Sequence, residues 1–125
     1  MDQPHPLPEI EGIWQVIRAE LGGQPMPADA AEHVKLRFSA QNYEVIFGAE
    51  ATDRGAYQIT PDTPFHKIAL TGTKGVNEGK TIPGILQLAG NRLRICYALE
   101  SEHAPTQFAA PNGTLNYLAT YRRKT

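Results

Sequence analysis

Four tyrosines occupy positions where buried phenols could bind a small molecule. Tyr43, Tyr57, Tyr97 and Tyr117 each fall on the apolar row of a run in which apolar and polar residues alternate. A buried tyrosine offers an aromatic ring and a hydroxyl that requires a hydrogen-bond partner. Several phenols that converge in one cavity suit a ligand with a few polar groups. The pattern therefore indicates binding chemistry.

Alternation also directs two cationic or titratable side chains toward the apolar side. Arg18 follows Trp14 and Val16 on one face of its strand, and His66 precedes Ile68 on another. A buried arginine could bind a ligand carboxylate through two parallel hydrogen bonds. In the alternative interpretation the strand twists or bulges and Arg18 reaches solvent. His66 is either a ligand contact or a hydrogen-bonded structural residue near the surface.

No arrangement typical of catalysis or of a metal site stands out. The glycine-rich run 75–81 is one residue short of a phosphate-binding loop, and a predicted strand follows it where that motif requires a helix. The run 100–103 contains two glutamates and a histidine but has no further histidine at ligand spacing. Neither Ser39 nor Ser101 lies in a nucleophile elbow. Cys96, between Ile95 and Tyr97, is predicted to be a small buried hydrophobe. We expect no catalytic residue, metal or cofactor.

Short alternating runs, separated by turn residues, predict an all-β fold of about eight strands with almost no helix. A proline followed by small residues predicts one or two helical turns over 27–32. Residues 1–9, with three prolines, are expected to be an extended segment that precedes a single domain over 10–125. The predicted strands cover residues 11–20, 34–39, 42–47, 55–60, 65–71, 82–88, 92–98 and 114–123.

Short sequential turns favour an antiparallel up-and-down barrel, in which the first strand pairs with the last and no sheet edge is exposed. A barrel of eight strands has room for its own side chains or for one small ligand. Both interpretations, a hollow barrel and a filled one, stay open. The side chains predicted to line the interior, besides Arg18 and His66, are Phe38, Tyr43, Tyr57, Ile68, Leu86, Tyr97 and Tyr117.

The first and last strands carry residues that suggest how one end of the barrel is closed. Gly12-x-Trp14 begins the first strand, and Arg122 and Arg123 end the last one. This combination resembles the signature of lipocalins and the wider calycin superfamily. The resemblance implies that Trp14 closes one barrel end and that Arg122 or Arg123 packs across it. It also adds an interpretation of His66 as an axial haem ligand, as in some calycins.

A narrower resemblance covers most of the chain. The segments GIWQVIRAELGGQPMP and GKTIPGILQLAGNRLRICYAL, followed by Pro105-Thr106-Gln107-Phe108, are similar to a bacterial lipocalin-like domain family whose activity is uncharacterised. This resemblance implies the barrel fold. It implies little about function, because a fold by itself assigns none.

Composition excludes several classes of protein. The 125 residues are 41% apolar and 20% charged, which is typical of one soluble globular domain. A formal net charge of −1 gives no long-range attraction to nucleic acid or anionic lipid. The single cysteine allows no internal disulfide, and the N-terminal residues do not form a signal peptide. No apolar run is long enough to span a membrane. We therefore expect a cytoplasmic protein that is not inserted into a membrane.

These observations predict non-catalytic binding of a small, mostly apolar or amphipathic molecule inside the barrel. In this hypothesis tyrosines and aliphatic side chains bury the ligand, and Arg18 or His66 orients it. The alternative is a filled barrel that acts through its surface as a protein-interaction or accessory module. A third hypothesis is an enzyme of the kind that calycin barrels occasionally host.

Overall fold

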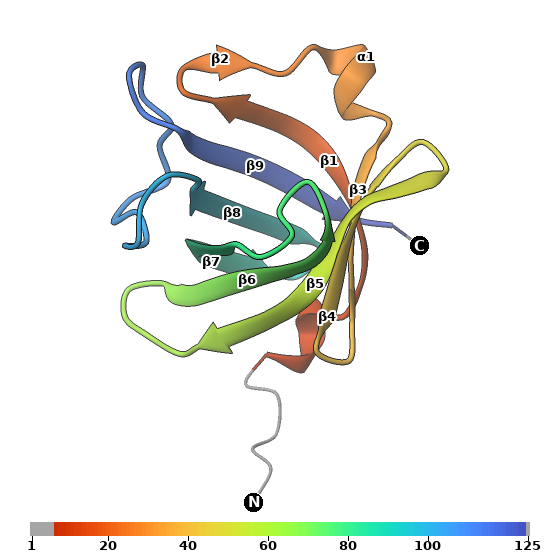
Figure 1. Ribbon diagram of the computed structural model, residues 1–125, viewed down its shortest axis with the longest axis horizontal. Coiled ribbons are helices and arrows are strands. Elements are labelled where there is room, and N and C mark those ends of the chain that lie inside the picture. The colour runs from red at the N-terminus through yellow and green to blue at the C-terminus, as the bar shows by residue number, and fades with distance from the viewer. Residues whose placement is uncertain (1–6, 125) are drawn as a thin grey trace, which may run out of the picture.

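The computed structural model, which describes residues 7–124, is built around one antiparallel sheet that closes on itself (Figure 1). Each strand pairs with the next along the barrel, and pairing of the last strand with the first completes the ring. The predicted all-β up-and-down barrel of eight strands is thus confirmed. Its strands are β1 (Gly12–Leu21), β3 (Val34–Ser39), β4 (Asn42–Phe47), β5 (Glu50–Thr60), β6 (His66–Gly75), β7 (Thr81–Ala89), β8 (Arg92–Ala98) and β9 (Asn116–Arg123).

Three short elements supplement the barrel. β2 (Gln24–Pro25) pairs with the end of β1, in a segment predicted to be only a turn. α1 (Ala28–Ala31) is the predicted short helix; it follows Pro27 and packs against β1, with Ala31 buried. η1 (Pro8–Ile10) is a single turn of 3-10 helix before β1. β1 pairs with β3 only from Gly12 to Gln15, and beyond that point the segment containing β2 and α1 lies beside β1.

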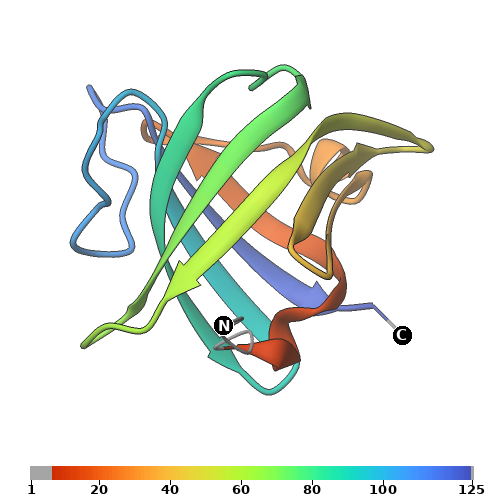
Figure 2. The same ribbon diagram turned by 60° about the horizontal axis from the view of Figure 1, so that its bottom comes forward.

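Neighbouring strands run in opposite directions, so strand starts and strand ends alternate around each rim of the barrel. We call the rim at the start of β1 and the end of β9 the Trp14 rim. The opposite rim, at the start of β5 and the start of β9, is called the Asp53 rim. Figure 2 shows η1, in red, across the Trp14 rim and the β6–β7 loop, in green, at the Asp53 rim.

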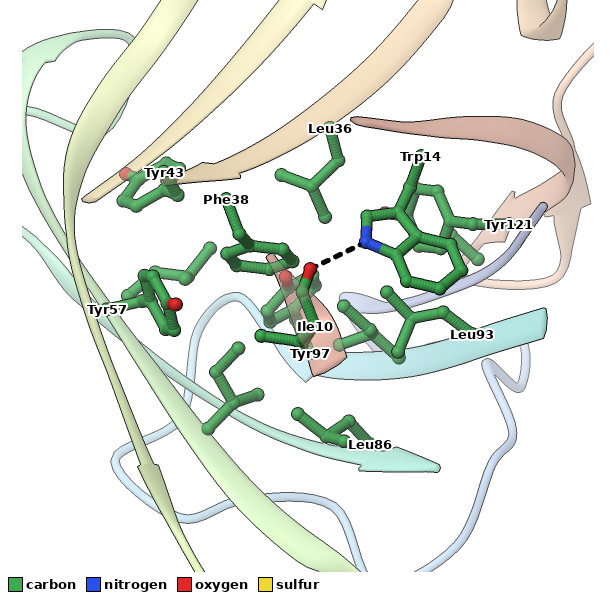
Figure 3. Close-up of a cluster of buried hydrophobic side chains, with 14 of the residues drawn as sticks. Ile10, Trp14, Leu36, Phe38, Tyr43, Tyr57, Leu86, Leu93, Tyr97 and Tyr121 are labelled. Atoms are coloured by element: carbon green, nitrogen blue, oxygen red, sulfur yellow. Dashed lines mark hydrogen bonds between the residues drawn. The ribbon is translucent and has the colours of Figure 1, made fainter. Parts of the chain in front are cut away.

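Packing at the Trp14 rim is tight and depends on the tryptophan. Trp14 and Ile10 are both completely buried, and the Trp14 indole Nε1 donates a hydrogen bond of 2.8 Å to the backbone carbonyl of Ile10 (Figure 3). This bond satisfies the one polar atom of the indole, which would otherwise carry a desolvation cost inside the core. The contact holds η1 against the barrel and buries Ile10 among the side chains of the interior.

Arg123, and not Arg122, packs on the tryptophan. The Arg123 guanidinium carbon lies 4.3 Å from the centre of a Trp14 ring, within the range of a cation–π contact. Its Nη1 donates to the carbonyl of Glu11 at 2.8 Å, and its Nη2 donates to the carbonyl of Glu9. Arg122 is exposed. The alternation pattern alone could not tell which of the two arginines packs on Trp14. The register of β9 against β1, which pairs Trp14 with Arg123, decides it.

Gly12 is required at the same rim for two reasons. Its φ of +130° lies in a region that side chains with a Cβ disfavour. A Cβ at this position would also lie 3.0 Å from Nη1 of Arg123. The glycine therefore lets the arginine cross the start of β1.

Two expectations about segment limits were wrong. An extended segment was predicted for residues 1–9. Residues 1–6 of it lie outside the described residues, and Pro8 and Glu9 belong to η1 instead of an extended segment. β5 begins at Glu50 rather than Gly55, and β6 continues to Gly75 rather than ending at Thr71. In both strands the apolar pattern stops at a register shift between Arg54 and Gly55, although the pairing continues beyond it.

We predict that Arg123→Ala lowers the free energy of unfolding by about 2 kcal/mol, because it removes two charge-assisted hydrogen bonds and a cation–π contact. Arg122→Ala, in which the next residue on the same strand is truncated, is the matched control and should change it by less than about 0.5 kcal/mol. Urea unfolding followed by circular dichroism measures both. Equal effects of the two substitutions would contradict the assigned role of Arg123.

Candidate functional site

Seven of the side chains predicted to line the interior lie in or against the core cluster inside the barrel (Figure 3). Six of them are at most 5% exposed, and Tyr117 is partly buried against them. Phe38 and Tyr57 contact each other edge to face at the Trp14 rim, with ring centres 4.6 Å apart. The seven are Phe38, Tyr43, Tyr57, Ile68, Leu86, Tyr97 and Tyr117.

Arg18 does not face the interior, which corrects the expectation from alternation. A bulge between Val16 and Arg18 shifts the register of β1 against β9 by one residue. Ala19, rather than Arg18, then occupies the next inward position and is 2% exposed. Arg18 is exposed on the outer face, so it cannot orient a ligand inside the barrel.

His66 lies on the inward row of β6, as alternation predicted, but near the Trp14 rim. It is half-buried and is paired with Leu86 of β7. Its Nδ1 atom is buried and has no hydrogen-bond partner. His66 and the polar groups at the Asp53 rim come from opposite ends of the barrel, so sequence alternation grouped residues that the fold separates.

The sequence interpretation missed Asp53, which is the one buried charged side chain of residues 7–124. Its Oδ2 accepts hydrogen bonds from the Tyr43 hydroxyl at 3.1 Å and from the Asn77 side-chain amide at 2.8 Å. Its Oδ1 is buried without a partner. The inward row of β5 runs Ile59, Tyr57, Gly55 and then Asp53. Continuing the alternation past Gly55 would have found the aspartate, but a carboxylate did not fit an apolar row.

Tyr97 supplies the second unpartnered polar atom at this rim. Its side chain is 5% exposed and its hydroxyl is buried without a hydrogen-bond partner. The ring is nearly parallel to that of Tyr117, with centres 6.4 Å apart. Burial, followed by the charges of Tyr117, Tyr43 and Asp53, raises the pKa of Tyr97 far above its ordinary value. Tyr43 belongs to this rim through its hydrogen bond to Asp53, and Tyr117 through its direct pairing with Tyr97.

Two inward-facing glycines position the two phenols. Tyr43 is paired directly with Gly55, and a Cβ on that glycine would lie 2.8 Å from Cε1 of the tyrosine. Tyr97 is paired directly with Gly84, and a Cβ there would lie 2.9 Å from its Cδ1. Each ring therefore lies over the backbone of the adjacent strand, in space that any other residue would fill. This arrangement explains how the barrel accommodates such large side chains.

The β6–β7 loop, residues 76–80, folds back onto the Asp53 rim. The Gly72 amide donates to the carbonyl of Lys80 at 2.9 Å, and the Gly79 amide donates to the carbonyl of Gly72 at 3.0 Å. A Cβ on inward-facing Gly72 would lie 2.0 Å from the carbonyl oxygen of Asn77. The loop thus closes over the inner face of β6 and delivers the Asn77 amide to Asp53.

The remaining candidates for chemistry are less reactive. Cys96 is fully buried, and burial raises the pKa of its thiol, although a backbone hydrogen bond with Ala109 acts in the opposite direction. Among residues 7–124, no three His, Cys, Asp or Glu side chains gather closely enough to hold a metal ion. The arrangement at the Asp53 rim instead offers one hydrogen-bond acceptor and one hydroxyl, both without partners.

No helix in the described part of the chain has the length and apolar character needed to cross a membrane. A scan against protein families and searches of curated proteins and of solved structures found nothing that matches this chain. Function is therefore inferred from the geometry of the barrel interior.

Removal of the hydroxyl group should change the stability of the protein differently at Tyr43 and at Tyr97. Tyr43→Phe removes a hydrogen bond to a buried carboxylate and should lower the free energy of unfolding by about 2 kcal/mol. Tyr97→Phe removes a buried hydroxyl that has no partner, so stability should stay the same or rise by up to about 1 kcal/mol. Urea unfolding of the two variants is the measurement. A larger loss for Tyr97→Phe would show that its hydroxyl has a partner in the apo protein.

Stability should also fall at alkaline pH, because the pKa of every tyrosine in the chain is raised in the fold. Burial, with a smaller effect of the charge of Glu11, raises the pKa of Tyr57 to about 12. The tyrosines of the unfolded chain lose their protons near pH 10. Their contribution to the free energy of unfolding is therefore fully present below about pH 10, and it is lost as the pH rises through their pKa values in the folded protein.

The test compares urea midpoints at about pH 8 and about pH 11, alongside a titration of tyrosinate absorbance. We expect a lower midpoint at the higher pH, and tyrosinate absorbance that rises together with unfolding. Tyrosines that ionise near pH 10 while circular dichroism still reports the folded barrel would contradict the prediction.

Proposed function

We propose that the barrel binds a small amphipathic molecule without catalysing a reaction, as a lipocalin-like carrier or sensor. The observation that carries the proposal is the pair of buried, unpartnered polar atoms at the Asp53 rim, Oδ1 of Asp53 and the hydroxyl of Tyr97. A ligand with a polar group placed between them would satisfy both. Its apolar part would contact the aliphatic side chains of the neighbouring inward rows, Ile68, Leu70 and Ile82.

The energetics of burial support this assignment. A buried polar group without a hydrogen bond costs about 1–3 kcal/mol, and more if the group is charged. Natural proteins keep few such groups, and they concentrate at functional sites. Two unpartnered groups at one rim, with two glycines that make room for the phenol rings beside them, fit a site built for an occupant.

Several exposed hydrophobic side chains lie at the same rim, which fits the entry of an apolar molecule. Six large hydrophobic side chains of residues 7–124 are exposed, and all but Ile17 lie at or near the ends of strands that form the Asp53 rim. The five are Leu21, Phe47, Val76, Leu99 and Leu115. The same side chains favour the second candidate function, in which the rim docks a protein partner and the barrel is a filled scaffold.

Native mass spectrometry of protein purified gently from its own host tests the binding function. We expect a small-molecule adduct that denaturing conditions release. Leu70→Trp, which fills the interior near the Asp53 rim, should abolish the adduct, whereas Ile17→Trp on the outer face should retain it. Circular dichroism checks that both variants are folded.

A mass without any adduct, together with no thermal shift from fatty acids, aromatic alcohols or amines, would contradict the binding function. An adduct that survives Leu70→Trp would place the bound molecule outside the barrel. Either result would direct attention to the apolar rim and a protein partner.

A further inference from the structure

We propose that the ligand carries a protonated primary amine, which Oδ1 of Asp53 binds as a charge partner at the inner end of the site. This inference depends on the proposed binding function and specifies the chemical class of the ligand. Asp53 would accept an N–H bond from the ammonium group, and the Tyr97 hydroxyl would accept a second one. The phenol rings of Tyr43 and Tyr117 would complete the surroundings of the cation.

The charge of Asp53 favours a cationic ligand. Asp53 is 3% exposed and is the one buried charged side chain in the described part of the protein. Both of its partners, the Tyr43 hydroxyl and the Asn77 amide, are neutral and bind Oδ2. None of the salt bridges between described residues includes Asp53. A buried carboxylate without a cation is costly, so a cationic ligand gains more here than a neutral one.

The charges around the interior disfavour an anionic ligand. An anionic ligand would need a cation inside the barrel, but Arg18 is exposed on the outer face. Arg123 is engaged with Trp14 and the carbonyl of Glu11 at the other rim. Asp53 would in addition repel a carboxylate or phosphate directly. The exposure of Arg18 also removes the one residue that, in the sequence, could have bound a ligand carboxylate.

The phenols around the carboxylate also suit a cation. Aromatic faces attract cations, and this attraction grows when the cation is removed from water. Tyr97 and Tyr117 lie nearly parallel at this rim, and the Tyr43 hydroxyl donates a hydrogen bond to Asp53 itself. A phenol that keeps its proton also offers lone pairs to an N–H donor. Phenols and one carboxylate together match an ammonium group with an apolar body.

Isothermal titration calorimetry with three probes of the same size tests the charge preference. The probes are phenethylamine, phenethyl alcohol and phenylacetate, which share a ring and differ in the polar end. We expect the amine to bind at least about tenfold more tightly than the alcohol, and phenylacetate to bind more weakly than both. Binding of the alcohol or of phenylacetate as tight as that of the amine would overturn the amine inference and leave the binding function in place.

Substitutions locate the effect. Asp53→Asn should remove the preference for the amine over the alcohol, because it removes the charge and keeps the shape. The matched control is Asp62→Asn, since Asp62 is an exposed aspartate outside the barrel that pairs with Lys67 at 3.2 Å; it should keep the preference. Tyr97→Phe should weaken the binding of phenethylamine several-fold. An amine preference that Asp53→Asn retains would overturn the inference.

One further measurement covers the case in which Asp53→Asn fails to fold. In the wild-type protein, saturating phenethylamine should shift the NMR signals of the Asn77 side-chain amide, because that amide shares the Asp53 carboxylate. The signal of Gln15, whose side-chain amide donates to Ala31 outside the barrel, should not move. An Asn77 signal that stays fixed at saturation would overturn the inference. If none of the probes bind and the host-purified protein has no adduct, the binding function fails as well.

Discussion

The pairing of β9 with β1 is the contact on which the rest of the structure depends. It runs from Trp14 with Arg123 to Leu21 with Tyr117, and it turns a sheet with two open edges into a ring. Once the ring is closed, the inward rows of strands far apart in sequence face each other. Tyr97 and Tyr117 already face each other through the pairing of β8 with β9, whereas Trp14 of β1 meets Arg123 of β9 only because the ring is closed.

Closure also divides the interior into two parts with different roles. At the Trp14 rim, the indole Nε1 has a partner and Ile10 fills the space beneath the tryptophan, while Nδ1 of His66 is buried there without one. At the Asp53 rim, a carboxylate oxygen and a hydroxyl are buried without partners. The residues that carry these two atoms lie on strands, which hold a binding site more precisely than loops do.

The strand pattern predicted the fold because alternation over short runs depends only on which residues face the core. It could not predict positions where the register changes. The bulge before Arg18 moved that residue outside. Asp53 lies beyond the expected start of β5 on an inward row whose alternation is unbroken, and it was missed because a carboxylate did not fit an apolar row. The choice between Arg122 and Arg123 likewise required the register of β9 against β1. The polar part of the candidate site was therefore missed where apolar alternation gave no signal, whereas its aromatic residues were identified.

The position of Trp14 has a practical consequence. It is the single tryptophan of the chain, it is completely buried, and a guanidinium lies 4.3 Å from its ring. Its fluorescence consequently reports the closed end of the barrel, whereas Oδ1 of Asp53 and the Tyr97 hydroxyl belong to the other end. Intrinsic emission can therefore follow folding in the presence of any ligand with little interference from the binding event itself.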